Sequence, residues 1–253
     1  MPMRGALRHL FLAFVAITMA VFGSGAAAAT MIGTPTLDKV TAITPGPDRL
    51  VGIAHPVTVR FAAPVADKAR AESNLDIRST QPLTGTYSWG AGDTELSWTP
   101  KDFLPANATV SVRYGTARTE FVTNAGVVAE GDMSAHTFTV SVGGQVVWVM
   151  PASFGKPGWE TPTGTFPILE KFRSVVFDSS TIGIPRNSSE GYYIQGEYAE
   201  RLTWGGVFVH SAPWSVDSQG YANVSHGCIN LAPDDAAWYY SNASVGDPVT
   251  IHW

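Results

Sequence analysis

The sequence predicts a mainly β protein made of two domains in tandem, each built from short strands. Two observations support this prediction. Residues 40–123 contain short runs of alternating apolar and polar residues about every ten residues, separated by Gly, Pro, Asn or Asp. The composition then changes near residues 126–134, and the remainder contains further strand-like runs but only one helical segment. Because 45% of the 253 residues are hydrophobic, the chain can fill such cores without disulfide bonds.

The first domain, placed at residues 30–129, is predicted to be an antiparallel sandwich of immunoglobulin type. Its seven strand-like runs are VTAI, VTVRF, LDIR, TYSW, ELSW, TVSVRY and TEFV, which begin at residues 40, 57, 75, 86, 95, 109 and 119. Seven short strands with regular turns are typical of this sandwich. GAGD at residues 90–93 indicates a hairpin, and residues 66–74 are a short helical candidate. The domain shows no cluster of catalytic side chains, so we expect a spacer or docking module.

The second domain, placed at residues 130–253, is predicted to be rich in strands with one short helix. HTFTVSVGGQVVWVM predicts two strands joined by a turn at Gly143 and Gly144, and FRSVVF, WGGVFVH and VGDPVTIHW predict three more. NLAPDDAAWYYSNA predicts the helix. Pro233 suits a first helical turn, and the two following aspartates complement the positive end of the helix dipole.

The first 29 residues have the layout of an export signal. Arg4 and Arg8 precede an apolar run of 13 residues from Leu10 to Phe22, and small residues up to Ala29 form a cleavage site. A transmembrane helix needs about 20 apolar residues, although a bilayer can thin around a shorter one, so an uncleaved anchor stays an alternative. We therefore expect export to the periplasm or cell wall, with membrane contact only if the leader is uncleaved.

The charge of the chain disfavours nucleic acid as a partner. The sequence has 16 Lys and Arg against 21 Asp and Glu, and removal of the leader makes the net charge more negative. Nucleic-acid binding depends on basic stripes that neutralise phosphates, and no block of like charges stands out. We expect no nucleic-acid partner and no cofactor.

The single cysteine, Cys228, has three possible explanations in an exported protein: a buried inert residue, an intermolecular disulfide, or a catalytic nucleophile. Its neighbours favour the nucleophile. Gly227 allows the backbone to approach a ligand closely. A helix begins a few residues later, and its N–H groups and dipole favour a thiolate or an oxyanion nearby. His226 and His210 are two candidate bases.

His210 is the better candidate for the base. In an extended segment, His226 and Cys228 lie on the same face, so their side chains point in parallel, which suits support better than proton transfer. His210 ends a separate strand and can approach the thiol from another direction, and we expect a base with a pKa near neutrality. Zinc binding by these three residues is disfavoured because no second ligand pair has a zinc-binding spacing.

The order of the residues separates classes of cysteine enzyme. Papain-like and NlpC/P60-like enzymes place the histidine well after the cysteine, whereas the only histidine after Cys228 is His252. Sortases place an arginine after the cysteine, whereas residues 202–253 contain no Lys or Arg. VHSAPWSVDSQGYANVSHGCINL strongly resembles the signature of L,D-transpeptidases with the YkuD fold, and TPTGTF at residues 161–166 resembles a second motif of that family. The likeness spans about residues 130–253 and is greatest to the mycobacterial members with one immunoglobulin-like domain.

This resemblance implies a YkuD-type β-sandwich and a peptidoglycan L,D-transpeptidase. Cys228 would attack a donor stem tetrapeptide at its third residue, and the side-chain amine of a second stem would take the acyl group, which makes a 3→3 cross-link. His210 would be the general base and acid, oriented by the backbone carbonyl of Ser211. His226 would line the site, and N–H groups near Gly227 would form part of the oxyanion hole. Carbapenem-type β-lactams would acylate the cysteine.

The same resemblance implies a set of substrate-binding residues beside His210. Tyr192 and a strand edge at Gly205 and Gly206 would hold the donor stem, and Trp214 and Asn230 would line the site. Two alternatives stay open at this point. An L,D-carboxypeptidase would use water in place of the amine, and a non-catalytic wall-binding module would carry the thiol without chemistry.

Overall fold

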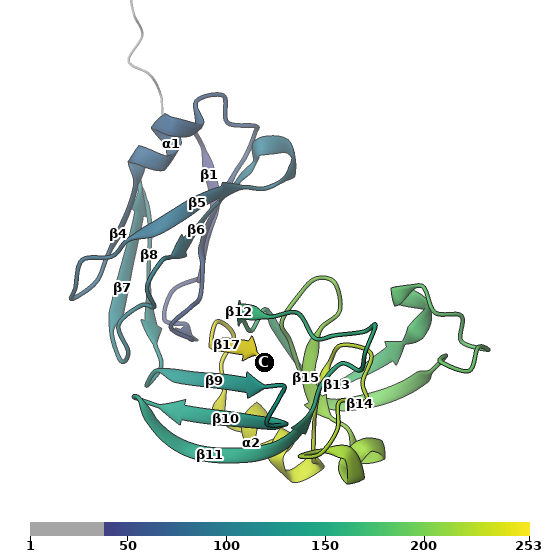
Figure 1. Cartoon of the computed structure of the whole chain (residues 1–253). Helices are drawn as coiled ribbons and strands as arrows, with labels where there is room; N and C mark the ends of the chain where they lie inside the picture. The colour runs from purple at the N-terminus through teal and green to yellow at the C-terminus, as the bar shows by residue number, and fades with distance from the viewer. Residues whose placement is uncertain (1–37) are drawn as a thin grey trace, which may run out of the picture. The chain divides into compact units, whose positions relative to one another are not determined.

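The computed structural model describes residues 38–253 (Figure 1). The predicted export leader at residues 1–29 therefore lies outside the described residues. Between residues 38 and 253, no helix is both long and apolar enough to cross a membrane.

The first domain consists of two four-stranded sheets, ordered β1-β3-β6-β5 and β2-β8-β7-β4. The strands of the first sheet are β1 (Val40–Thr44), β3 (Val57–Phe61), β5 (Gly85–Trp89) and β6 (Glu95–Pro100). Those of the second are β2 (Leu50–Val51), β4 (Leu75–Arg78), β7 (Thr109–Tyr114) and β8 (Ala117–Thr123). Helix α1 (Lys68–Asn74) precedes β4, and the short 3₁₀ helix η1 (Ala91–Asp93) joins β5 to β6.

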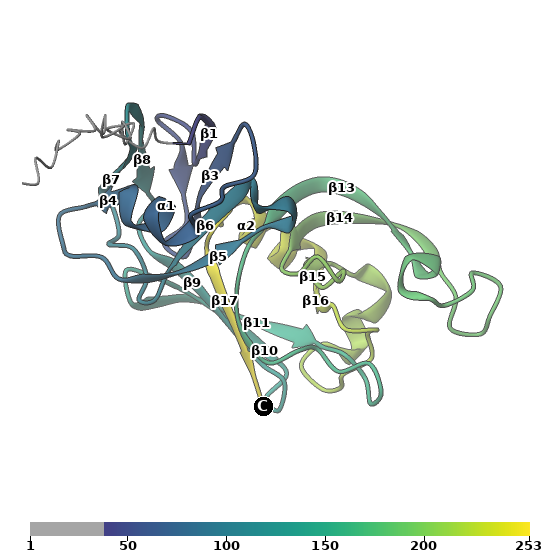
Figure 2. The ribbon, with the colours of Figure 1, turned by 90° about the horizontal axis from the view of Figure 1, so that it is seen from above.

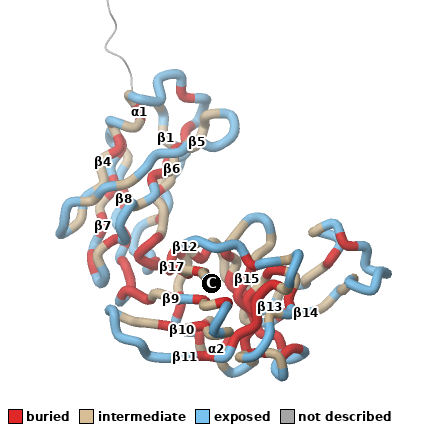
Figure 3. Tube along the Cα trace, viewed as in Figure 1, coloured by how far each residue is buried: buried red, intermediate tan, exposed pale blue. Residues whose placement is uncertain are grey.

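The predicted sandwich is confirmed, because each of the seven predicted runs lies in a strand. Buried and exposed residues alternate along β7 and β8, since successive side chains of a strand point to opposite faces (Figure 3). The inward side chains include Leu96, Val110 and Phe121, which are fully buried. Strand β2 was not predicted, because two residues are too short to show a period.

The second domain is built on a nine-stranded sheet ordered β12-β17-β9-β10-β11-β16-β15-β14-β13. Most neighbours are antiparallel, but β15 and β16 are parallel, as are β9 and β17. The strands are β9 (Val127–Asp132), β10 (Thr137–Val142), β11 (Gln145–Ser153), β12 (Gly164–Pro167), β13 (Glu170–Asp178), β14 (Tyr193–Arg201), β15 (Phe208–Ser211), β16 (Ile229–Leu231) and β17 (Pro248–His252). The connections include 3₁₀ helices η2 (Ser179–Ile182) and η3 (Pro213–Ser218).

Helix α2 (Pro233–Asn242) is the predicted helix after the cysteine, and it packs against β14 and β15. It begins with Pro233 in its first turn and no side-chain cap at Ala232. Its Tyr239 ring meets Phe138 edge-on at 4.9 Å, and both side chains are fully buried. Packing against the sheet, rather than capping, therefore stabilises this helix.

Strands β13 and β14 run side by side and carry the connecting residues 179–192 at their far end (Figure 2). This connection forms one wall of the candidate site. The strand predicted at residues 204–210 begins only at Phe208, because residues 203–206 form a turn in which the Gly206 N–H donates to the Thr203 carbonyl. The expected strand edge at Gly205 and Gly206 is therefore a turn.

The junction between the domains lies close to residue 127. Strand β9 pairs with β10 and β17 of the nine-stranded sheet, so the boundary that we placed between residues 129 and 130 falls inside this strand. Just before it, the Asn124 side-chain amide donates to Asp247 Oδ1 at 2.7 Å. This buried contact ties the segment before β9 to the turn that follows α2.

Candidate active site

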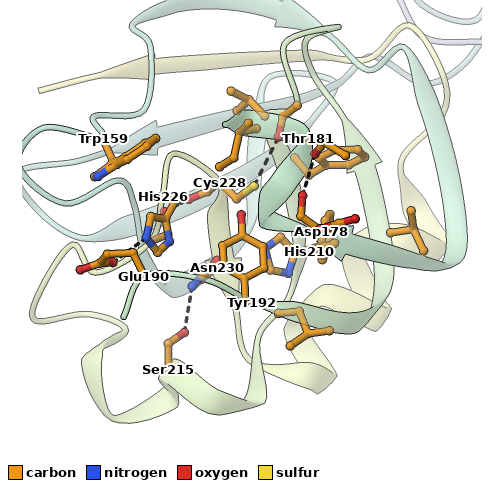
Figure 4. A pocket seen from close by; sticks show the side chains of 18 of the residues that line it. Trp159, Asp178, Thr181, Glu190, Tyr192, His210, Ser215, His226, Cys228 and Asn230 are labelled. Atoms are coloured by element: carbon orange, nitrogen blue, oxygen red, sulfur yellow. Dashed lines mark hydrogen bonds and ion pairs between the residues drawn. The ribbon is translucent and has the colours of Figure 1, made fainter. Parts of the chain in front are cut away.

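Cys228 lies immediately before β16, at the end of a bend formed by residues 226–228. Its Sγ is 3.6 Å from the Gly206 carbonyl oxygen, and its side chain lines a cavity of about 960 Å³ (Figure 4). Gly227 has a φ of +116°, a conformation that residues with a side chain rarely adopt. The bend replaces the extended segment that we expected between His226 and Cys228, so their side chains are not simply parallel.

His210 reaches the same cavity from β15, and the parallel pairing of β15 with β16 explains why. The register places His210 beside Asn230, which lies two residues after Cys228. Cys228 immediately precedes β16, so this register brings it close to β15, and both side chains line the same cavity. His210 Nδ1 lies 2.8 Å from the Ser211 carbonyl oxygen. Because a carbonyl only accepts hydrogen bonds, Nδ1 carries the proton and Nε2 is left with the lone pair.

Burial favours the neutral forms of both Cys228 and His210. Desolvation raises the pKa of the Cys228 thiol to about 11, only partly opposed by a hydrogen bond from Phe208. Desolvation also lowers the pKa of His210 to about 4, and the hydrogen bond to Ser211 opposes this shift only in part. The near-neutral pKa that we expected for the base is therefore wrong, and a preformed thiolate is disfavoured. The cause is the low-dielectric surroundings, which penalise either charged form.

His226 and Tyr192 form the other side of the cavity. The two rings lie 5.4 Å apart, and the Trp159 ring meets His226 edge-on at 5.3 Å. Burial, and then the neighbouring Cys228, raise the pKa of Tyr192, so its hydroxyl keeps its proton at neutral pH. His226 Nε2 lies 2.8 Å from Glu190 Oε2. In the view of Figure 4, Cys228 lies between His226 and His210.

The remaining predicted residues also line the cavity, but they differ in exposure. Trp214 is 51% exposed, and its ring lies 5.8 Å from that of His210. Asn230 is buried, and its amide donates to Ser215 Oγ at 3.1 Å. Gly205 and Gly206 lie in the turn before β15 and face the cavity. The structure therefore brings all the predicted binding residues to one cavity.

One expected oxyanion donor is already engaged. The Gly227 N–H donates to Ser225 Oγ at 3.0 Å, and that hydroxyl donates to the Cys228 carbonyl at 2.6 Å. These two bonds hold the bend in place. The Cys228 N–H is therefore the better candidate donor in this segment.

Sequence reasoning missed Trp159 and Glu190, which line the cavity, and Lys156, which binds the Glu190 carboxylate. Each lies in a Gly- and Pro-rich or Ser-rich connection, far along the chain from the cysteine, and no local pattern links them to it. Across residues 38–253, no group of three or more His, Cys, Asp or Glu side chains is arranged to hold a metal ion.

The comparisons with known proteins agree with this architecture. Residues 127–251 match the family model of the L,D-transpeptidase catalytic domain, and residues 25–120 match that of a bacterial Ig domain. L,D-transpeptidase 1 of Mycobacterium tuberculosis is 45% identical over 251 residues, which cover 98% of this chain and 99% of that protein. This chain belongs to the L,D-transpeptidase family.

Solved structures of L,D-transpeptidases have the same fold. An L,D-transpeptidase from Mycobacterium smegmatis is 54% identical with a TM-score of 0.81, and the match covers 86% of this chain and all of that one. The L,D-transpeptidase LdtMt1 in complex with imipenem is 47% identical with the same TM-score of 0.81 and the same coverage. The predicted enzyme class is confirmed, and a non-catalytic wall-binding module is disfavoured. L,D-transpeptidases use a cysteine nucleophile, and Cys228 is the only cysteine of this chain.

Proposed function

We propose that this L,D-transpeptidase joins peptidoglycan stem peptides by 3→3 cross-links, with Cys228 as the nucleophile and His210 as the general base and acid. The observation that carries the proposal is the presence of both side chains at one cavity, with His210 Nδ1 held by the Ser211 carbonyl. The donor is a stem tetrapeptide that ends in D-alanine. The acceptor is the side-chain amine of the diamino acid in a second stem.

In the first half-reaction, Sγ forms a bond to the carbonyl carbon of the third donor residue. The thiol is protonated at neutral pH, so its proton passes to His210 Nε2 as the S–C bond forms. The C–N bond to the terminal D-alanine then breaks, and His210 returns the proton to the departing amine. The Ser211 carbonyl accepts the Nδ1–H bond throughout and stabilises the transient imidazolium.

The tetrahedral intermediate places negative charge on the former carbonyl oxygen. We assign the Cys228 N–H and the Tyr192 hydroxyl as its hydrogen-bond donors. Tyr192 supports this role because it keeps its proton and lies near enough to Cys228 for their charges to interact. Removal of one such donor typically slows an acyl transfer by about 10² to 10³.

In the second half-reaction, the acceptor amine attacks the thioester. His210 Nε2 takes a proton from the attacking nitrogen and delivers it to Sγ as the C–S bond breaks, which regenerates the thiol. The thioester retains the energy of the peptide bond that was cleaved, so no external energy source is needed. Tyr192, Gly205 and Gly206 would line the donor path, with Trp214 and Asn230 on the His210 side.

A β-lactam would react at the same cysteine. LdtMt1 has been solved in complex with imipenem, and its likeness to this chain supports acylation of Cys228 by carbapenems. Because the ring opens without a leaving group, the protein should gain the mass of one whole drug molecule. We further propose that residues 1–29 direct the protein to the periplasm or cell wall, where its substrate lies.

The test is incubation of the purified protein with a stem tetrapeptide, followed by mass spectrometry. We expect a cross-linked dimer and free D-alanine. Cys228→Ser should yield no dimer, because a serine hydroxyl is a much weaker nucleophile without strong activation. Tripeptide without dimer would indicate a carboxypeptidase, and at least a tenth of the normal rate in Cys228→Ser would contradict the assignment of the nucleophile.

A further inference from the structure

Three connections of the catalytic domain meet at the carboxylate of Glu190, at the mouth of the active-site cavity. Glu190 Oε2 accepts a hydrogen bond from Lys156 Nζ at 2.5 Å. It accepts a second from His226 Nε2 at 2.8 Å (Figure 4). Lys156 follows β11, Glu190 precedes β14, and His226 lies just before the nucleophile. One exposed side chain therefore ties the wall that carries Tyr192 to the segment that carries Cys228.

The contact with Glu190 determines which nitrogen of His226 carries a proton. Hydrogen bonds from Lys156 and then from His226 lower the pKa of Glu190, so the carboxylate is ionised at neutral pH. An ionised carboxylate only accepts hydrogen bonds, so His226 Nε2 must donate. A neutral His226 is then protonated at Nε2, and its Nδ1 is left as an acceptor.

The ring of His226 is also held in its plane. Trp159 meets it edge-on at 5.3 Å, and Tyr192 lies at 5.4 Å with an interplanar angle of 44°. In Figure 4, Glu190 approaches His226 from the side away from Cys228. The carboxylate therefore fixes the proton and the orientation of the ring without facing the nucleophile.

We propose that Glu190 is a positioning residue of the transpeptidase, which holds His226 in the Nε2–H tautomer. The two active-site histidines then have opposite tautomers, because His210 is protonated at Nδ1 by its bond to Ser211. His210 Nε2 receives the proton of the reaction. His226 Nδ1 offers the cavity a fixed acceptor, which suits an N–H group of the bound peptide or amine.

Loss of Glu190 frees His226 to exchange tautomers and orientation. A charge-assisted hydrogen bond is roughly twice as strong as a neutral one, so its loss should lower kcat by about ten-fold. Lys156→Met removes the bond that connects Lys156 to Glu190 but leaves the bond between Glu190 and His226 in place. It therefore separates the effect of the His226 tautomer from the effect of the contact between the two loops. It should alter KM for the donor more than kcat, with the tautomer unchanged.

The experiment measures two quantities in the full chain: the tautomer of His226 by long-range ¹H–¹⁵N NMR without substrate, and kcat and KM for dimer formation. Glu190→Ala, Glu190→Gln, Lys156→Met and a control, Glu197→Gln, are compared with the unaltered protein. Glu197 is a good match because it is exposed and paired with Arg173, with 54% of its side chain exposed against 49% for Glu190. The His226 signals are assigned by comparison with His226→Gln.

We expect His226 to be purely Nε2–H in the unaltered protein. Glu190→Ala should give mixed tautomers and about a ten-fold lower kcat. In Glu190→Gln, kcat should recover to within about three-fold of the unaltered protein, because the amide oxygen still accepts a hydrogen bond. An Nδ1–H tautomer in the unaltered protein overturns the inference. The inference is also overturned if His226 keeps the Nε2–H tautomer in Glu190→Ala, or if Glu190→Ala and Lys156→Met have the same kcat and KM. The kinetic part rests on the proposed function, but the NMR measurement needs no substrate, so a failure of cross-linking would not be mistaken for a failure of this inference.

Discussion

Lowering the pH from 7 to 5 should leave the rate of acylation of Cys228 almost unchanged. Burial lowers the pKa of His210 to about 4, so about 90% of the imidazole is still neutral at pH 5 and can accept the thiol proton. A histidine with an ordinary pKa of 6.5 would be only about 3% neutral at pH 5, and its acylation rate would fall about 25-fold from its value at pH 7.

The alkaline side of the profile tests the same mechanism. Burial raises the pKa of Cys228 to about 11, so a reaction that needed a preformed thiolate would accelerate about ten-fold for each pH unit from 7 to 9. Transfer of the proton to neutral His210 during the attack gives no such increase. We therefore expect a plateau from about pH 5 to pH 9.

His210→Ala provides the perturbation. Loss of a general base should slow acylation by about 10² to 10⁴ at pH 7. The residual rate should then climb with pH, because only the thiolate can react. His252→Ala is a suitable control, since His252 is exposed and paired with Glu130 away from the cavity.

The assay is the rate of imipenem adduct formation, followed by mass spectrometry across this pH range, with circular dichroism to verify the fold. A ten-fold or larger fall of the unaltered protein between pH 7 and pH 5 would refute the argument from burial. A plateau in His210→Ala equal to that of the unaltered protein would show that His210 is not the base.

Three further predictions follow from single contacts. Tyr192→Phe should slow acylation by about 10²-fold in the same assay, because it removes one oxyanion donor but retains the ring beside His226. An unchanged rate would exclude the Tyr192 hydroxyl from this role. Phe138→Ala should lower the free energy of unfolding by about 3–5 kcal/mol in urea titrations, whereas Phe103→Ala at an exposed site should change it little; equal losses would contradict the assigned core. Gly227→Ala should cost about 1–3 kcal/mol in the same titrations and also slow acylation, whereas Gly92→Ala, strained at a φ of +76°, should affect stability alone.

Much of the first domain could be predicted because its strands expose one face to water. Along β7 and β8, the alternation of buried and exposed side chains is written directly in the order of apolar and polar residues. Strand β16 shows the opposite case. Its three residues are all buried, so they have no period, and only its neighbours β11 and β15 define it as a strand.

The candidate site was predictable where its parts are close in sequence. Cys228, Gly227 and His226 stand together, and the motif around them pointed to a nucleophile. Glu190 lies 36 residues from His226, and nothing in its own segment marks it as a partner of that ring.

The sequence by itself determined the two-domain β architecture, the enzyme class and the identity of the nucleophile, because these depend on local alternation, on turn residues and on a motif within one stretch of chain. The tertiary structure alone decided the strand order that brings His210 to Cys228, the bond from His210 Nδ1 to the Ser211 carbonyl, and the direction of the pKa shifts of His210 and Cys228. Those properties depend on desolvation and on contacts between residues far apart in the chain, and the contacts exist only once β15 and β16 lie side by side.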